Sequence, residues 1–290
     1  MPAAVRMLAL GDEKVDVTHR PLVMGILNRT PDSFYDRGET FALDALVRRA
    51  EALVLDGADL LDIGGVKAGP GPDVTEDEEL ERVIPAVEAV RRRVDVPISV
   101  DTWRAEVARQ AFRAGAVVGN DISGFSDPDY LTVAAAAGAT VVATHIRLVP
   151  RVADPDPVYG DVVGDVAAVL QGHAARARAA GIAPERIVLD AGLDLGKTAE
   201  QSLVLLRASG VLAGLGYPLL LSASNKTFLG VTLDLELRQR GPASLAAAAL
   251  GTVLGCRVLR VHDAAGTRRV CDTLARIAEC SPMAPGPAMP

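Results

Sequence analysis

The chain contains eight apolar segments of strand length, and each one stops abruptly at polar or ionisable residues. Their Val, Ile and Leu residues run continuously instead of alternating with polar ones, which is typical of parallel strands covered on both faces. The segments are VMGILN (23–28), DLLDIGG (59–65), PISVDT (97–102), AVVGND (116–121), TVVATH (140–145), RIVLDAG (186–192), PLLLSASNK (218–226) and CRVLRVHD (256–263). Helical stretches are expected between and after them, at 43–56, 76–93, 103–114, 129–137, 161–181, 199–210, 241–255 and 266–279.

Eight successive strand–helix units predict an α/β protein with the architecture of a (β/α)8 TIM barrel. The active site of such a barrel lies where the strands end, so the polar endings are the candidate site residues. A simpler interpretation remains open for each of them, because a polar residue at a strand end can also cap a helix or close a turn. The endings are Asn28, Asp62, Asp101, Asn120, Asp121, His145, Asp190, Ser224, Lys226, Arg260, His262 and Asp263.

Residues 1–280 are expected to form one domain, since barrels of this kind commonly reach about 250 residues or more. Two short strand-like runs within residues 5–18, around Gly11 and Asp12, predict a β-hairpin that covers the bottom of the barrel. Residues 281–290 are rich in Pro, Ala and Gly and predict a disordered tail.

The charge balance excludes some classes of partner. A net charge of −7 and a pI near 5.2 argue against nucleic acid and against an anionic membrane surface. No segment approaches the roughly 18 apolar residues of a membrane span, and no signal-peptide core is recognisable. Cys256, Cys271 and Cys280 lack the spacing of a zinc site or a disulfide framework, so reduced thiols in a cytoplasmic protein are expected. Arginines within helical stretches are interpreted as solvated: Arg91–Arg93, Arg238, Arg240, Arg268 and Arg269.

Two local patterns concern helix starts. Thr75 with Glu78, and Thr198 with Gln201, have the spacing of capping boxes. The segment 192–198 resembles a phosphate-binding P-loop, but Ala191 stands where its first glycine should be. A strand, a glycine turn and a helix start explain this segment without a nucleotide.

Eight sequence blocks, one after each strand, carry a family resemblance. They are MGILNRTPDSF (24–34), DIGG (62–65), SVDT (99–102), NDISG (120–124), DPVYGDVV (156–163), DAGLDLGK (190–197), SNKTFLG (224–230) and RVHD (260–263). Single blocks of this kind occur by chance, whereas eight in order are specific. The chain resembles dihydropteroate synthase, the pterin-binding barrel of folate synthesis, over nearly its whole expected domain.

The resemblance implies a reaction and a set of residues. The family joins 6-hydroxymethyl-7,8-dihydropterin diphosphate to p-aminobenzoate, and diphosphate leaves as the arylamine attacks the pterin methylene. The implied residues are Asp101, Asn120, Asp190 and Lys226 for the pterin, Asn28, Arg260 and His262 for the diphosphate, Asn28 for Mg²⁺, and Asp101, Lys226 and Asp36 for catalysis. Carboxylates, an amide and an ammonium suit the donor–acceptor edge of a pterin, and Arg260 and His262, two residues apart, are expected on one face at the rim.

The second-substrate side departs from the family pattern in three segments. Val66, Lys67, Ala68 and Gly69 replace Glu, Ser, Thr and Arg, in a loop that we expect to be exposed. Asn225 and Thr227 alter a usual S-R-K-S, while Leu195 replaces an aromatic residue and Asp194 adds a carboxylate. Outside these three segments, residues 144–148 at the end of the fifth strand are also changed.

With this uneven pattern of changes, the chain is similar to a divergent second-copy branch of the family, in which synthase activity is expected to be weak or absent. Three alternatives stay open: an active synthase, a non-catalytic protein that binds a pterin or a sulfonamide or sulfone, and a methyltransferase-type pterin barrel. Family resemblance further implies a homodimer through residues 241–279.

Overall fold

The computed structural model describes residues 7–29 and 43–280. Asp36, expected to be catalytic, and the expected tail 281–290 lie outside the described residues. Eight parallel strands close into a barrel in the order β10-β3-β4-β5-β6-β7-β8-β9. These are β3 (Leu22–Asn28), β4 (Leu60–Gly64), β5 (Ile98–Asp101), β6 (Val118–Asp121), β7 (Thr140–Thr144), β8 (Ile187–Asp190), β9 (Leu219–Leu221) and β10 (Cys256–Val261). The predicted (β/α)8 barrel is confirmed.

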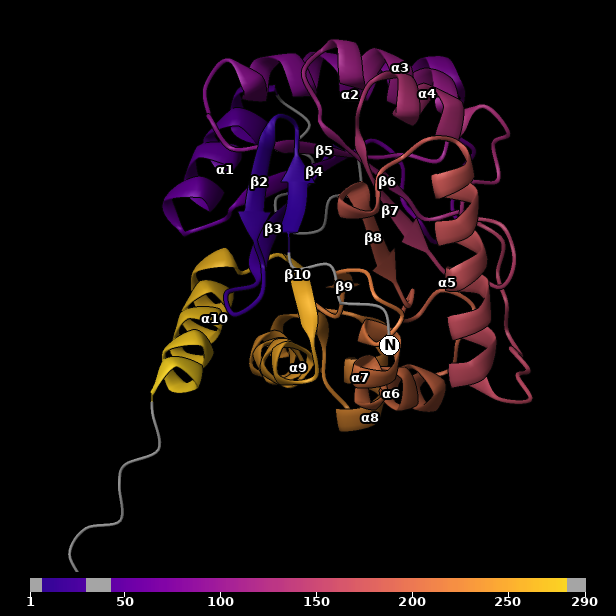
Figure 1. The fold of residues 1–290 in the computed structure, drawn as a ribbon, viewed down its shortest axis with the longest axis vertical. Helices are drawn as coiled ribbons and strands as arrows, with labels where there is room; N and C mark the ends of the chain where they lie inside the picture. The colour runs from indigo at the N-terminus through magenta and orange to yellow at the C-terminus, as the bar shows by residue number, and fades with distance from the viewer. Residues whose placement is uncertain (1–6, 30–42, 281–290) are drawn as a thin grey trace, which may run out of the picture.

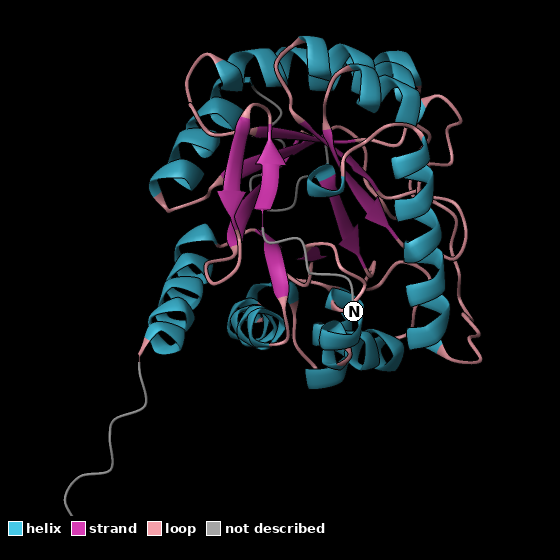
Figure 2. Ribbon diagram, viewed as in Figure 1, coloured by secondary structure: helices cyan, strands magenta, loops and turns pink. Residues whose placement is uncertain are grey.

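Helices surround the barrel (Figures 1 and 2). They are α1 (Leu43–Leu55), α2 (Glu76–Arg91), α3 (Ala105–Arg113), α4 (Tyr130–Ala136), α5 (Val162–Ala179), α6 (Ala199–Arg207), α7 (Ser209–Ala213), α8 (Thr227–Leu233), α9 (Gly241–Val253) and α10 (Ala264–Glu279). The described residues also form the 3-10 turns η2 (Pro184–Arg186) and η3 (Leu237–Gln239). Both predicted capping boxes, at α2 and α6, are confirmed. Helix α8 was missed, because no helix was expected between residues 226 and 241.

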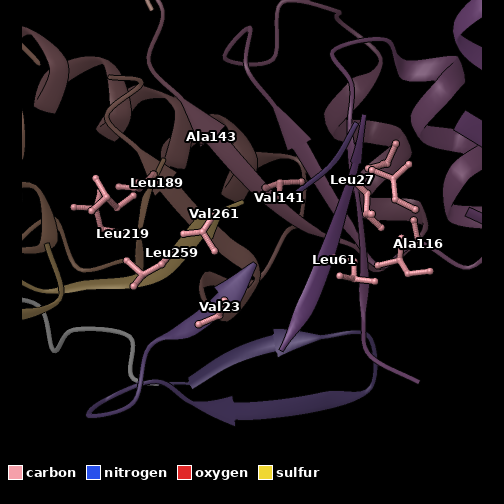
Figure 3. Close-up of a cluster of buried hydrophobic side chains, with 14 of the residues drawn as sticks. Val23, Leu27, Leu61, Ala116, Val141, Ala143, Leu189, Leu219, Leu259 and Val261 are labelled. Carbon is pink, nitrogen blue, oxygen red and sulfur yellow. The ribbon is translucent and has the colours of Figure 1, made fainter. Parts of the chain in front are cut away.

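The strands bury side chains on both faces, which explains their continuous apolar sequences. One set packs between the barrel and the helices, and Figure 3 shows ten labelled members, among them Val23, Leu61 and Leu259. The opposite set, which includes Met24, Leu60 and Val258, forms a second cluster with the N-terminal hairpin. Side chains on a strand alternate between faces, so neighbouring apolar residues serve both clusters.

The antiparallel hairpin of β1 (Met7–Leu10) and β2 (Glu13–Asp16) closes one end of the barrel. Leu8 and Leu10 join the interior cluster and are 1% and 5% exposed. Thr140 in β7 donates a hydrogen bond to the carbonyl of Ala9, and Arg186 donates one to Gly11 O at 2.8 Å. The predicted hairpin at the barrel bottom is confirmed.

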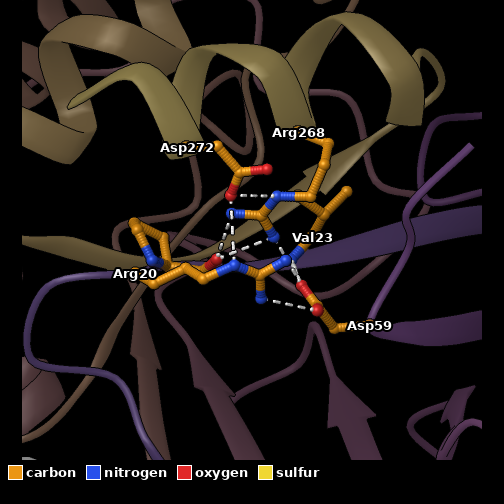
Figure 4. Close-up of polar contacts among 6 residues, drawn as sticks. Arg20, Val23, Asp59, Arg268 and Asp272 are labelled. Carbon is orange, nitrogen blue, oxygen red and sulfur yellow. Dashed lines mark hydrogen bonds and ion pairs between the residues drawn. The ribbon is translucent and has the colours of Figure 1, made fainter. Parts of the chain in front are cut away.

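An ion-pair cluster joins the first barrel strand to the last helix (Figure 4). Asp59 accepts hydrogen bonds from Val23 N at 2.7 Å and from Arg268 Nη1 at 2.8 Å, and Asp272 pairs with Arg268 Nε at 2.9 Å. Arg20 pairs with both carboxylates at 3.0 and 3.1 Å. Arg268 is therefore buried, and its interpretation as a solvated helix residue was wrong.

Candidate active site

Polar side chains inside the barrel lie directly above the apolar cluster that contacts the hairpin. Leu60, Val118, Val188 and Val258 belong to that cluster, and two residues later on the same strands come Asp62, Asn120, Asp190 and Arg260. A spacing of two keeps both members of each pair on the inner face. The apolar members therefore form a floor, and the polar members form the layer next to the strand ends.

Arg260 lies between two carboxylates in this layer. Its Nε donates to Asp62 Oδ2 and its Nη2 donates to Asp101 Oδ2, both at 2.6 Å. Burial, opposed by Arg260 and reinforced by the charge of Asp62, raises the pKa of Asp101 to about 7. The described contacts of Arg260 are to carboxylates inside the barrel, because its side chain lies on the same inner face of β10 as that of Val258. Its expected role toward the diphosphate stays a prediction.

Asp62 is a functional candidate that was not assigned a role from sequence. It is fully buried, and its Oδ2 accepts from Asn120 Nδ2 at 3.1 Å as well as from Arg260. Its Oδ1 is buried without a described partner, so a ligand donor could still be accepted there. The signal was present, since Asp62 ends an apolar run, but its partners depend on how neighbouring strands are staggered.

Asp190, at the end of β8, and Lys226, which follows β9, continue this polar layer around the barrel. Asp190 Oδ1 accepts a hydrogen bond from Gly192 N at 2.8 Å. This carboxylate therefore also closes a local turn, which is the simpler role that a polar strand ending can have. Lys226 Nζ donates to Leu193 O at 2.5 Å. Burial raises the pKa of Asp190 and lowers that of Lys226, and the charge of each opposes the shift in the other.

The diphosphate candidates Asn28 and His262 lie together at the mouth. Both line a cavity of about 540 Å³, which is also lined by Arg49, Ser224 and Asn225. His262 Nδ1 lies 3.0 Å from Ser224 Oγ. Removal from water, with the charges of Arg260 and Arg49, lowers the pKa of His262 to about 4, although part of its side chain remains exposed.

The altered loop after β4 is pinned to the loop after β7. Arg151 donates from Nη1 to Lys67 O at 3.2 Å and from its backbone N to Ala68 O at 3.0 Å, and its other guanidinium nitrogen donates to Pro72 O. Val66 is only 7% exposed, so the expected exposure of the whole loop was wrong at this position. At Gly69 an added Cβ would meet nothing within 4 Å, so that position does have space for a side chain.

On the second-substrate side, Leu195, Asn225 and Thr227 occupy three different surroundings. Leu195 is half-buried, and its carbonyl accepts from Lys197 Nζ at 2.9 Å. Asn225 has a positive φ of 58° and lies against α9, where its N donates to Ser244 Oγ at 3.0 Å. Thr227 is exposed at the start of α8.

Other strand endings have local structural roles. Asp121 accepts from Ser123 N and Phe125 N at 2.6 and 3.1 Å, and Asp263 caps α10 through Gly266 N. Lys197 is buried, and its Nζ contacts His145 Nδ1 at 3.0 Å.

The segment 192–198 does not have the features of a P-loop. The ammonium of Lys197 donates to Gly192 O at 2.8 Å and to Leu195 O, so the lysine is turned into its own loop. Gly192 has a φ of 62°, and a Cβ there would lie 1.9 Å from His145 O. The glycine is required by this close approach, which supports the interpretation of the segment as a glycine turn.

The fold and this layer define a barrel with a ligand site at the ends of its strands, where carboxylates, an amide and cations face a shared interior. Residues 24–262 match the family model described as pterin binding enzyme. An inactive dihydropteroate synthase 2 of Mycobacterium leprae is 46% identical over 89% of this chain and 91% of its own length. A dihydropteroate synthase of Synechocystis is 42% identical over 91% and 92%.

Solved structures agree with these relatives. Yersinia pestis dihydropteroate synthase in a sulfonamide drug complex superposes with a TM-score of 0.89 at 37% identity, over 94% of this chain and 98% of that one. The Xanthomonas albilineans enzyme with 4-aminobenzoic acid gives 0.87 at 36% identity, over 95% and 99%. The chain belongs to the pterin-binding enzyme family, among the dihydropteroate synthases and their homologues. In the described part of the chain, none of the helices has the length and apolar character needed to cross a membrane.

Proposed function

We propose that this protein binds 6-hydroxymethyl-7,8-dihydropterin diphosphate inside the barrel. The observation that carries the proposal is the buried group of Asp62, Asp101, Asn120 and Arg260, joined by hydrogen bonds of 2.6 to 3.1 Å. Polar groups are costly to bury unless they serve a network or a ligand. Asp190 and Lys226 extend the same layer, and together these residues supply donors and acceptors for the amino-pyrimidinone edge of a pterin.

The diphosphate is assigned to the mouth, beside Asn28 and His262. Mg²⁺ commonly binds through one or two protein oxygens together with substrate phosphates and water, so a single amide oxygen such as that of Asn28 suits it. Within residues 7–29 and 43–280 no three His, Cys, Asp or Glu side chains converge as an all-protein metal site. The ion would neutralise charge on the leaving diphosphate. Asn28 would hold it, and His262 would donate to the phosphate oxygens.

Condensation with p-aminobenzoate is proposed to be weak or absent. Asn225 stands where the family has an arginine, so it supplies no cation, and its N donates to Ser244 of α9. The loop 66–72 is held by Arg151. The identity to a relative named as inactive favours this reading. The alternative is an active dihydropteroate synthase that tolerates these changes. It is favoured by the similar identity to the Synechocystis enzyme and by the p-aminobenzoate complex of a structural neighbour.

The proposed compartment is the cytoplasm, and the proposed assembly is a homodimer. The three cysteines are free thiols, as expected in a reducing cytoplasm. A homodimer through residues 241–279 is proposed because α9 exposes apolar side chains: Leu250 is 44% exposed and Val253 is 68% exposed.

Calorimetric titration with the pterin diphosphate and Mg²⁺ tests the proposed ligand. Lys226→Ala should weaken binding by about 1–3 kcal/mol, because a buried ligand acceptor would lose its charged donor. Lys14→Ala is the matched control, since Lys14 lies on the hairpin and pairs with Glu185 at the surface. Absence of heat from the wild type at millimolar ligand would refute the proposed pocket. Steady-state turnover with p-aminobenzoate on the same samples separates the inactive from the active reading.

A further inference from the structure

Two threonines of β7, Thr140 and Thr144, have hydroxyl groups in opposite situations. Thr140 Oγ1 donates a hydrogen bond to Ala9 O in the N-terminal hairpin. Thr144 Oγ1 is buried and has no hydrogen-bond partner among the described residues, and Thr144 as a whole is only 1% exposed. A buried hydroxyl without a partner is costly, so such a group in a folded protein needs an explanation.

The side chain of Thr144 faces the barrel interior beside Asp190. Thr144 is in register with Asp190 of β8, and two residues earlier Val142 and Val188 are also in register and belong to the interior cluster. Residues two apart on a strand share a face, and neighbouring strands lie about 4.8 Å apart. The hydroxyl and the carboxylate are therefore neighbours in the polar layer that is proposed to hold the pterin.

The turn at Gly192 uses one side of each of these two residues. A Cβ added at Gly192 would lie 3.2 Å from Thr144 Cγ2, so the methyl group of the threonine lies toward this turn, and the hydroxyl is the other branch of its side chain. Asp190 Oδ1 accepts from Gly192 N, whereas no described group donates to Asp190 Oδ2. One hydroxyl oxygen and one carboxylate oxygen thus remain for a ligand.

These two oxygens select the kind of ligand group. An ionised carboxylate only accepts hydrogen bonds, and a hydroxyl oxygen can accept them as well. An exocyclic amino group carries two N–H bonds in one plane and can donate to both oxygens. A carbonyl at the same place would bring its own oxygen against the carboxylate of Asp190, so the pair favours an amino group.

We propose that Thr144 is a further specificity-determining residue, whose hydroxyl accepts a hydrogen bond from the exocyclic amino group of the bound pterin while Asp190 accepts the other. This inference rests on the proposed pterin site and deepens it, because it names the ring substituent that the site selects. The hydroxyl is then left without a protein partner because its partner arrives with the ligand.

The test compares two probes that differ only in the amino group: 6-hydroxymethylpterin and 6-hydroxymethylpteridin-4-one, which lacks it. Calorimetric dissociation constants for both probes and thermal unfolding without ligand are measured for wild type, Thr144→Val and Thr144→Ser. Valine keeps the branched shape and removes the hydroxyl, whereas serine keeps the hydroxyl and removes the methyl group. Thr140→Val is the matched control, because it removes a hydroxyl from the same strand and the same face that does have a protein partner.

Thr144→Val should weaken binding of the amino probe at least about fivefold, the effect of one lost hydrogen bond, and should change binding of the other probe less than about twofold. Its unfolding midpoint should equal or exceed that of wild type, since no protein hydrogen bond is lost. Thr144→Ser should retain the preference for the amino probe. Thr140→Val should show the opposite result, a lower midpoint with both affinities unchanged.

Two results would overturn the inference alone. An equal loss for both probes in Thr144→Val would show that the residue acts through packing. A lower unfolding midpoint with unchanged affinities would show that its hydroxyl is bonded within the protein. Absence of binding of either probe to the wild type at millimolar concentration would instead overturn the proposed function, and this inference with it.

Discussion

At the scale of single residues, the central feature is one guanidinium shared by two carboxylates. Arg260 holds Asp62 and Asp101 at 2.6 Å each, and Asp62 is fully buried. One positive charge cannot fully compensate two negative ones in a medium of low dielectric. Burial is the main cause that raises the pKa of Asp101 to about 7; Arg260 opposes the rise, and the negative charge of Asp62 adds to it. Asp101 can therefore change its charge near neutral pH, beside the proposed position of the pterin ring.

This shift predicts a pH dependence of stability. An acid whose pKa is higher in the folded chain stabilises the fold below its unfolded pKa, here 3.8, and loses that contribution as the pH rises through about 7. The unfolding free energy of wild type minus that of Asp101→Asn should fall by more than about 1 kcal/mol between pH 4 and pH 7. Denaturant titrations across this range measure it. Parallel profiles of the two proteins would mean that Asp101 is ionised throughout.

This geometry explains which site residues could be predicted from the sequence. Asp62, Asn120, Asp190 and Arg260 could each be placed at a strand end, because the apolar runs stop there. Which of them meet could not be predicted, since contacts across the barrel depend on strand stagger, and a sequence does not display that stagger. Arg260 was consequently paired with His262 by its spacing of two, whereas β10 ends at Val261 and His262 lies beyond the strand.

At the scale of elements, the loops after β4 and β7 form one connected rim. Arg151 binds carbonyls of the first loop, and Arg147 pairs with Asp154 within the second. Arg104 adds hydrogen bonds to Val74 O and Thr75 O from the loop after β5. Long loops are usually the mobile part of a barrel, but these have fixed partners on neighbouring loops. A loop that opens for a second substrate would have to break them.

Removal of one partner should release the rim. Arg151→Ala should raise amide hydrogen exchange of residues 67–72 by at least about fivefold, because about 1 kcal/mol of hydrogen bonding to these carbonyls is lost. Arg147→Ala is the control, since its partner Asp154 lies in the same loop and not in 66–74. Equal protection of 67–72 in both variants would show that other contacts hold the loop.

Sequence reasoning was most accurate where local chemistry decides the element. Thr75 and Thr198 start helices through their own side chains, so α2 and α6 could be located from sequence. It was least accurate from Ser224 to Lys226, where β9 has already ended at Leu221 and the chain turns through Asn225 at a positive φ. The length of β9 follows from its pairing with β8 and β10, which no local pattern encodes.

At the scale of the whole molecule, the helices α6, α7 and α9 each expose apolar side chains. Val204, Val211 and Val253 are 41%, 59% and 68% exposed. Figure 1 shows these three helices gathered on one side of the barrel. Exposed apolar side chains on a folded protein commonly mark an interface, and the proposed dimer through residues 241–279 would cover those on α9.

A charge at the exposed end of α9 should weaken the proposed dimer. Val253→Glu is expected to raise the dimer dissociation constant at least about tenfold, because a carboxylate would be desolvated without a partner. Sedimentation equilibrium measures the constant. Val169→Glu on α5, where the native side chain is 39% exposed, controls for added surface charge. A wild-type protein that stays monomeric at high concentration would refute the dimer itself.

The hairpin that closes the barrel floor also imposes an order of events. Leu8 and Leu10 seal the interior from below, so whatever occupies the layer of Asp62 and Arg260 has come in past the strand ends and must depart the same way. The site therefore opens at one end only, so the ligand that lies deeper must bind first and dissociate last. Inhibition kinetics should therefore show ordered binding, in which the ligand at the strand ends blocks dissociation of the ligand below it.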